Sequence, residues 1–386
     1  MRAHEAMRKR IIQLIVPAFM LIGLPLAGII VSGHDFHTYL EFPPTTKYVS
    51  HAPFSMPVFC GLSVFILAWI LPVVYRCVIC VRSEAKIRGE KHFSLPCWGY
   101  TGLAALILSW TLAWTRFHWF RALQPFTFLP LWLSFIVCVN ALTEKRKGVS
   151  LMTEQPRIFL CLFPASAVFW WFFEYLNRFV QNWYYVEAAN LGPVGYFLVA
   201  SASFSTVLPA VLSTRELLLS FPFFEKAFGN YAKLNCGCNK LAVSVFLGLS
   251  ALGLACIGSF PDYLFPLVWV SPVILLVSLQ SLANQQHILS GIAEGRWTTV
   301  VASALSALIC GFFWEMWNYF SMAKWIYSIP YVQRFHLFEM PLLGYAGYLP
   351  FGLECAVAAE ILLPAIQKPD GGPDHAEGPA HVSFLN

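Results

Sequence analysis

Ten long apolar stretches run through this sequence, separated by short polar segments. Each is close to the roughly 20 residues that an α-helix needs to cross a hydrocarbon core of about 30 Å. With 12% charged residues, the chain carries about half the charge of an average soluble domain. The sequence therefore predicts an all-α fold, a polytopic membrane helix bundle of about 10 transmembrane helices. The predicted spans are residues 11–32, 54–75, 97–115, 126–142, 158–178, 194–212, 241–260, 264–282, 298–318 and 340–362.

The composition excludes a cytosolic enzyme, a secreted disulfide scaffold and a disordered tail protein. The first stretch follows Arg8, Lys9 and Arg10. It is longer than the usual core of a signal peptide, so we expect a membrane anchor, with a cleaved signal peptide as the alternative.

The distribution of basic residues predicts the orientation in the membrane. Of the 25 Lys and Arg residues, 19 fall in the segments that share a side with the N-terminus under a ten-span topology, and the other six, counting Arg178 at the end of span 158–178, fall on the opposite side. Because basic loops stay in the cytoplasm, we expect a multi-pass protein of the cell (inner) membrane with both termini cytoplasmic. Basic edges suit anionic lipid headgroups, so membrane lipid is the expected partner and no nucleic acid is implied.

An internal duplication is the strongest organisational signal. FFEYLNRFVQNWYY at residues 172–185 resembles FWEMWNYFSMAKWIY at residues 313–327. The match pairs Glu174 with Glu315, Asn177 with Asn318, Trp183 with Trp325 and Tyr185 with Tyr327. Chance similarity between aromatic-rich helices is the alternative. Because each half contains four spans, an even number, the sequence predicts two parallel four-helix repeats.

The duplication divides the chain into four predicted units. They are an N-terminal two-helix hairpin (1–95), a first four-helix repeat (96–240), a second four-helix repeat (241–364) and a disordered cytoplasmic tail (365–386).

The matched glutamates are the first candidate site residues. Glu174, Asn177 and Arg178 have the spacing of one helix face, and Glu315 and Asn318 repeat the start of that pattern. An ionisable residue within a span is costly unless it faces the bundle interior, water or a partner. Tyr319 stands where the first repeat has Arg178, so Glu315 is the better candidate for a proton carrier or acid. The alternative is that both pairs are structural hydrogen bonds between helices.

Aromatic residues suggest what the site holds. Trp171, Trp314 and Trp317 lie beside the glutamates in sequence. Of the 14 Trp residues, 11 fall in the outer half of the predicted spans or in the outer loops. We therefore predict an outward-facing aromatic and carboxylate pocket. Such a pocket suits a cation, and it equally suits a flat apolar lipid. An interfacial aromatic belt is the alternative.

The last predicted span begins with an unusual concentration of Gly, Pro and Glu. The segment EMPLLGYAGYLPFGLE starts at Glu339 and ends at Glu354, and such a helix should kink or break. Span 194–212 also contains Gly and Pro. Interrupted helices at corresponding positions of two repeats are typical of a transporter's binding site, so Glu339 and Glu354 join the candidates. Close helix packing without a ligand is the alternative.

Metal and cofactor signals are weak. The cysteines at 77, 80, 236 and 238 could form a zinc site, but we interpret them as ordinary small apolar residues and predict no metal. The sequence identifies no cofactor and contains no phosphate-binding loop.

Three functions remain open. The first is a transporter or lipid-handling permease for a cationic or amphipathic small molecule. The second is a membrane-embedded enzyme acting on a lipid or isoprenoid, with Glu174 and Glu315 as an acid and base pair. The third is a non-catalytic membrane scaffold subunit.

Overall fold

A helix occupies each of the ten apolar stretches in the computed structural model of the chain, which describes residues 2–44, 46–84, 93–186, 191–234 and 239–366. The helices are α1 (Arg2–Val31), α2 (His37–Leu40), α3 (Met56–Glu84), α4 (Cys97–Trp114), α5 (Phe128–Lys147), α6 (Leu151–Glu154), α7 (Pro156–Val180), α8 (Gly192–Phe204), α9 (Val207–Leu219), α10 (Pro222–Phe228), α11 (Lys240–Cys256), α12 (Pro261–Leu264), α13 (Leu267–Leu282), α14 (Thr298–Phe320) and α15 (Tyr348–Ile366). The strands are β1 (Trp183–Val186), β2 (Lys324–Tyr327), β3 (His336–Leu337) and β4 (Met340–Pro341).

The described helices are long and apolar enough for a membrane protein. Six candidate spans lie in the described part of the chain, at Met56–Arg82, Gln124–Lys147, Pro156–Val180, Gly192–Leu219, Thr298–Phe320 and Leu342–Leu362. Shorter apolar helices lie at Ile15–Val31, Lys240–Cys256 and Leu267–Leu282. The prediction of a helical membrane protein is confirmed at this level, whereas the count of about ten spans remains a prediction.

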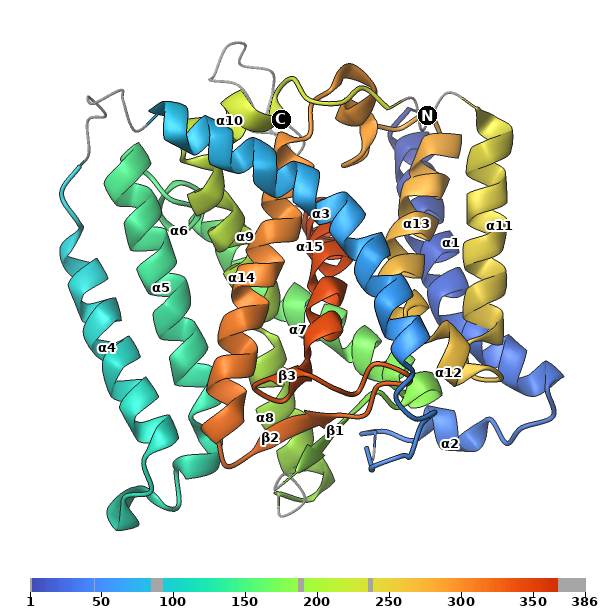
Figure 1. Cartoon of the computed structure of the whole chain (residues 1–386), viewed down its shortest axis with the longest axis horizontal. Coiled ribbons are helices and arrows are strands. Elements are labelled where there is room, and N and C mark those ends of the chain that lie inside the picture. The colour runs from blue at the N-terminus through green and yellow to red at the C-terminus, as the bar shows by residue number, and fades with distance from the viewer. Residues whose placement is uncertain (1, 45, 85–92, 187–190, 235–238, 367–386) are drawn as a thin grey trace.

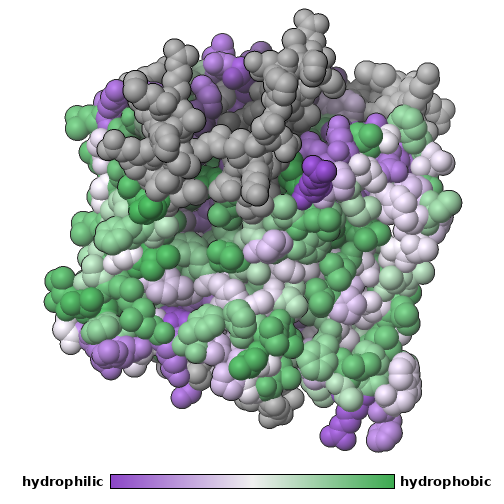
Figure 2. All heavy atoms as spheres, turned by 180° about the vertical axis from the view of Figure 1, so that it is seen from behind, coloured by the Kyte–Doolittle hydropathy of each residue, from purple (hydrophilic) through white to green (hydrophobic). Residues whose placement is uncertain are grey.

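The helices are arranged with four of them at the centre. Helices α7, α9, α14 and α15 lie in the middle of the bundle, α4 packs along α5 on one flank, and α11 packs along α13 on the other (Figure 1). Hydrophobic side chains cover the middle of the rear face, and hydrophilic ones gather towards its upper and lower edges (Figure 2). That surface pattern is the one expected of a protein surrounded by lipid.

Helices α14 and α15 cross closely. A Cβ atom on Gly352 would lie 2.0 Å from the backbone oxygen of Ser303, so only glycine permits this approach. Small residues at helix crossings are typical of membrane bundles, because they allow backbones to pack directly against each other.

The predicted span 194–212 is interrupted in the structure. Helix α8 ends at Phe204 and α9 begins at Val207. The hydroxyl of Ser166 in α7 donates to the Phe204 carbonyl at 2.6 Å and accepts from the Leu208 N–H at 3.0 Å. A single side chain therefore satisfies backbone groups on both sides of the break.

The span predicted at 340–362 is also interrupted. Its first half contains β4 and the 3₁₀ segment η5 (Leu342–Gly347), and the α-helix begins at Tyr348. Both breaks were expected from the glycine and proline content, and both are found.

Two short β-ribbons accompany the helices, and the chain is mostly helical with little sheet, which is consistent with the predicted all-α membrane bundle. Strands β1 and β2 pair antiparallel, with Trp183 opposite Tyr327 and Tyr185 opposite Trp325. Strands β3 and β4 form the second ribbon. The β1–β2 ribbon lies at one end of the bundle, whereas the Arg2 end of α1 and the Ile366 end of α15 both lie at the other (Figure 1).

The helix in the predicted span 194–212 continues beyond the predicted end, because α9 reaches Leu219. Arg215 lies within this extension and is only 2% exposed. Of the predicted tail, residues 367–386 lie outside the described residues.

Candidate functional site

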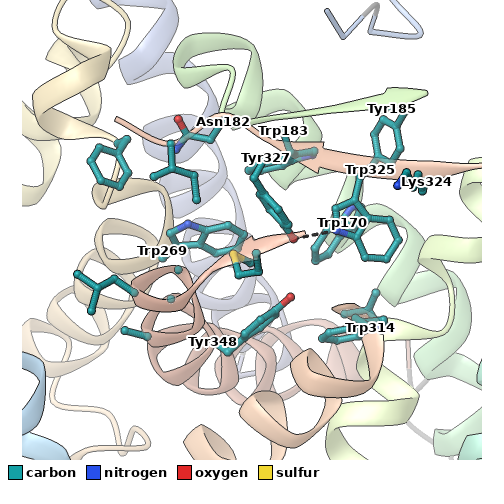
Figure 3. Close-up of a pocket in the computed structure, with 18 of the residues that line it drawn as sticks. Trp170, Asn182, Trp183, Tyr185, Trp269, Trp314, Lys324, Trp325, Tyr327 and Tyr348 are labelled. Carbon is teal, nitrogen blue, oxygen red and sulfur yellow. Dashed lines mark hydrogen bonds between the residues drawn. The ribbon is translucent and has the colours of Figure 1, made fainter. Parts of the chain in front are cut away.

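A cavity of about 610 Å³ lies between the β1–β2 ribbon and the helices beneath it (Figure 3). Its volume is within the range of small-molecule sites, about 300–1,000 Å³. Most of its wall is aromatic or aliphatic. The aromatic lining residues are Phe65, Trp69, Phe128, Trp170, Trp183, Tyr185, Tyr196, Phe204, Phe265, Trp269, Trp314, Trp325, Tyr327 and Tyr348.

One wall of the cavity is formed by α3. The side chains of Leu62, Phe65, Ile66, Trp69 and Ile70 line the cavity, and their spacing places them on one face of the helix. The helix is otherwise peripheral, because only 6% of the residues in its apolar segment are buried inside the protein. The cavity is therefore separated from the surrounding lipid on this side by a single helix, which crosses the bundle diagonally in Figure 1.

Glu315 lies directly behind the cavity wall. It is fully buried in α14, and its Oε1 accepts hydrogen bonds from the hydroxyls of Tyr327 at 2.7 Å and Tyr348 at 2.6 Å. The indole N–H of Trp325 donates to the Tyr327 oxygen at 2.9 Å. Tyr327 and Tyr348 point their hydroxyls into the cavity from opposite sides, with the ring of Trp314 beside them (Figure 3).

Glu174 occupies the corresponding place on α7. It is also fully buried, and its Oε1 accepts from the Tyr185 hydroxyl at 2.6 Å. Two indole N–H groups complete the contact, from Trp183 at 3.0 Å and Trp170 at 3.1 Å. Each of the two carboxyl groups contacts aromatic donors that line the cavity, and it lies one hydrogen bond behind them.

The matched asparagines hold the two strands. Asn177 donates to the Trp183 carbonyl at 2.8 Å and accepts from the Trp183 N–H at 3.3 Å. Asn318 makes the same two contacts to the Trp325 backbone, at 2.8 Å and 3.0 Å. Each asparagine side chain therefore makes the two backbone hydrogen bonds that a neighbouring strand would make to this residue.

Burial is the main cause of the shifted pKa values of two tyrosines in the cavity wall. Burial, followed by the charge of Glu174, raises the pKa of Tyr185 well above its usual value. Burial and the charge of Glu315 do the same to the pKa of Tyr327. Both hydroxyls are therefore neutral at physiological pH. Among the described residues, the Oε2 atoms of Glu174 and Glu315 have no hydrogen-bond partner.

Arg178 is directed to the N-terminal segment. Its Nη1 donates to the Tyr39 carbonyl at 2.5 Å, and the neighbouring Tyr175 hydroxyl donates to the Ile22 carbonyl at 2.5 Å. These contacts join α7 to α1 and to α2. Although Arg178 follows Glu174 by one helical turn in sequence, its Nη1 contacts the Tyr39 carbonyl.

The other predicted site residues lie outside the cavity wall, with one exception. Trp314 lines the cavity. Trp171 donates from its indole N–H to the Ser201 hydroxyl at 2.9 Å, and Trp317 packs against Trp132 with ring centroids 5.2 Å apart.

The two remaining predicted acids have different surroundings. Glu339 follows β3 and forms an ion pair with Lys324 at 2.5 Å. Glu354 is buried in α15, 1% exposed, and does not line the cavity.

Several lining residues were not predicted as site residues. Trp183, Tyr185, Trp325 and Tyr327 belonged to the sequence match, and their repetition was the signal that could have selected them. Trp170 precedes Glu174 by four residues, which places both on one helix face. Trp269 and Tyr348 carry no local signal, because they reach the cavity only through the packing of α13 and α15.

The described residues form no group of three or more His, Cys, Asp or Glu side chains that could hold a metal ion. Cys77 and Cys80 lie on α3, and the positions 236 and 238 lie outside the described residues.

Comparisons of the chain with protein-family models, with curated proteins and with solved structures found no match. The functional conclusion therefore depends on the geometry of this chain alone.

Proposed function

We propose that this chain is a multi-pass cell-membrane protein that transports or otherwise handles an amphipathic, largely apolar small molecule, which it binds in the aromatic cavity. The observation that carries the proposal is the cavity itself. Its wall is mostly apolar. Tyrosine and tryptophan side chains of the wall supply polar groups, and several of these are hydrogen-bonded to Glu174 or Glu315 behind the wall. A mostly apolar wall with a few placed polar groups is the usual character of a small-molecule site.

The position of α3 supports entry from the membrane. A lipid-like molecule is dissolved in the bilayer, so its shortest path to the cavity is sideways through the wall made by α3. That helix is held by few buried residues, and a displacement of α3 would open the cavity to lipid without disturbing the central helices.

The matched contacts of the two halves support the proposed duplication. In the ribbon, Trp183 lies opposite Tyr327 and Tyr185 lies opposite Trp325. In the sequence match, Trp183 corresponds to Trp325 and Tyr185 corresponds to Tyr327, so replacing each residue of one pair by its counterpart gives the other pair. This is the relation expected when two parallel repeats meet about a pseudo-two-fold axis along the membrane normal. The ten-span topology with cytoplasmic termini belongs to the same proposal. It is supported by the basic-residue bias and by the common side of both chain ends.

The enzyme alternative depends on direct access to the carboxyl groups. Glu174 and Glu315 lie behind the lining residues, so acid or base chemistry on a bound molecule would have to pass through Tyr185, Tyr327 or Tyr348. Binding requires no such relay, and we therefore favour transport or lipid handling.

A substitution that fills the cavity tests the proposal. Val199 lines the cavity from α8, and its neighbour Leu198 is 60% exposed on the outer surface. We expect Val199→Trp to abolish saturable binding of tritiated dodecanol, measured by scintillation proximity with the full chain in nanodiscs. The matched variant Leu198→Trp should bind like the unchanged chain. Absence of saturable binding in the unchanged chain, or equal binding by both variants, would contradict the proposed site.

A further inference from the structure

Three of the four tyrosines that line the cavity donate their hydroxyl hydrogen to a buried carboxyl group, and Tyr196 is the exception among the described residues. Tyr327 and Tyr348 both donate to Oε1 of Glu315, and Tyr185 donates to Oε1 of Glu174. A hydroxyl group has one hydrogen and two acceptor lone pairs. Each of these hydroxyls can therefore only accept a hydrogen bond from a ligand.

This assignment holds for Glu174 in either protonation state, and for Glu315 when its carboxyl group is ionised. The contacted atom is Oε1 in every case, whereas Oε2 of both glutamates is the buried atom without a partner among the described residues. If a carboxyl group is protonated at Oε2, its Oε1 remains a carbonyl acceptor. Two of the donors to Glu174 are indole N–H groups, which have no acceptor role.

Some other donors of the wall are occupied as well. The indole N–H groups of Trp170 and Trp183 are bonded to Glu174, and that of Trp325 is bonded to the Tyr327 oxygen. Lys324, a cation at the cavity wall, is paired with Glu339 at 2.5 Å. The part of the wall around Tyr185, Tyr327 and Tyr348 consequently presents hydroxyl lone pairs and aromatic faces to a ligand.

We infer that the cavity selects an amphipathic amine, with its protonated nitrogen held by the oxygens of Tyr348 and Tyr185 and by the faces of the surrounding indole rings. An ammonium group supplies only donors and a positive charge. Both match a wall of acceptors, aromatic quadrupoles and two buried carboxyl groups. The inference rests on the proposed function and adds the chemical class of the ligand.

An anionic amphiphile would meet the opposite situation. A phosphate or carboxylate offers only acceptors and a negative charge, which would face the lone pairs of Tyr185, Tyr327 and Tyr348 and lie near two buried carboxyl groups. Like charges repel each other strongly in a low dielectric. The same wall therefore disfavours a fatty acid or a phospholipid headgroup.

A displacement series tests the charge preference. Full-length protein in nanodiscs of zwitterionic lipid is loaded with tritiated dodecanol and titrated with dodecylamine, unlabelled dodecanol, dodecanoate or dodecyl phosphate. We expect dodecylamine to displace the label at a concentration at least 10-fold lower than dodecanol, and both anions to require more than dodecanol.

Variants identify the groups responsible. Tyr348→Phe removes a hydroxyl acceptor of the cavity while keeping the ring, and Glu315→Gln removes the charge while keeping an acceptor oxygen for Tyr327 and Tyr348. Either change should reduce the preference for dodecylamine over dodecanol, measured within the same variant, to less than about 3-fold. Tyr319→Phe, at a side chain that is 40% exposed and outside the cavity wall, is the matched control and should keep the preference.

The outcomes separate the two proposals. If dodecanol binds saturably but dodecylamine displaces it no better than dodecanol, or an anion displaces it better, the amine inference is overturned and the proposed cavity site stands. If Tyr348→Phe and Glu315→Gln both keep the full preference, the inference is likewise overturned. If dodecanol does not bind saturably, the proposed function itself fails.

Discussion

Glu174 and Glu315 occupy matched positions but reach their donors in different ways. Trp170, four residues before Glu174, supplies one indole N–H. Gly311 stands four residues before Glu315, and the ring of Tyr348 fills the space that a side chain would take there. The missing tryptophan of the second half is thus replaced by a tyrosine from another helix.

Gly311 is therefore required by packing. A Cβ atom at this position would lie 2.4 Å from the Tyr348 ring, so Gly311→Ala must displace an aromatic side chain in a full core. We expect a stability loss of about 1–3 kcal/mol, as is usual for overpacking, and a weaker amine preference. Unfolding in mixed detergent micelles measures the loss.

The matched control is Gly248→Ala on α11, where a Cβ atom meets nothing within 4 Å. This change should be neutral or slightly stabilising, because alanine is the better helix former. If the two variants have equal stability, the packing explanation of Gly311 is wrong.

At the residue scale, the sequence predicts the paired residues but not their partners in space. The repetition of Glu, Asn, Trp and Tyr predicts which side chains act together. It does not show that Glu315 also contacts Tyr348, which is 33 residues away and joins only when α15 packs on α14. Nor does it show that Trp171 and Trp317 point away from the cavity, because neighbouring aromatic residues on a helix look alike in sequence.

At the element scale, the interrupted helices were predicted from glycine and proline, whereas the means of stabilising one break were not. Ser166 is an ordinary serine in sequence. It bridges the α8–α9 break only because α7 passes beside it. The strands were missed for a related reason, since four-residue aromatic segments cannot be distinguished from loops until their pairing is known.

Loss of the Ser166 hydroxyl should destabilise the bundle. Ser166→Ala leaves the Phe204 carbonyl and the Leu208 N–H without this partner in a buried site, which should cost about 1–3 kcal/mol. Ser63→Ala is the control, because the Ser63 hydroxyl contacts only the Phe59 carbonyl of its own helix. Equal unfolding midpoints for the two variants would show that the bridge contributes nothing.

At the scale of the whole molecule, the Arg2 end of α1 and the Ile366 end of α15 lie opposite the β1–β2 ribbon. Sequence predicts this arrangement through the bias of Lys and Arg, since an even number of spans returns the chain to its starting side. The cavity at the ribbon end would then open towards the outside of the cell.

Thiol labelling in intact cells tests this orientation. Lys47 is exposed near the ribbon and Lys240 is exposed at the opposite end of the bundle. A membrane-impermeant maleimide should label Lys47→Cys in intact cells above the level of the unchanged chain. It should label Lys240→Cys only after the cells are permeabilised. The reverse pattern would place the cavity on the cytoplasmic side.

The central claim is that the space below the β1–β2 ribbon is a binding site for an amphipathic molecule. An experimental density map of the full chain, purified with native lipid and supplied with dodecylamine, tests it most directly. We predict continuous non-protein density in the space enclosed by α3, α13, α14 and the ribbon, with its polar end within hydrogen-bond distance of the Tyr348 hydroxyl. A map in which side chains fill this space, or in which the added molecule lies only on the outer surface of the helices, would contradict the claim.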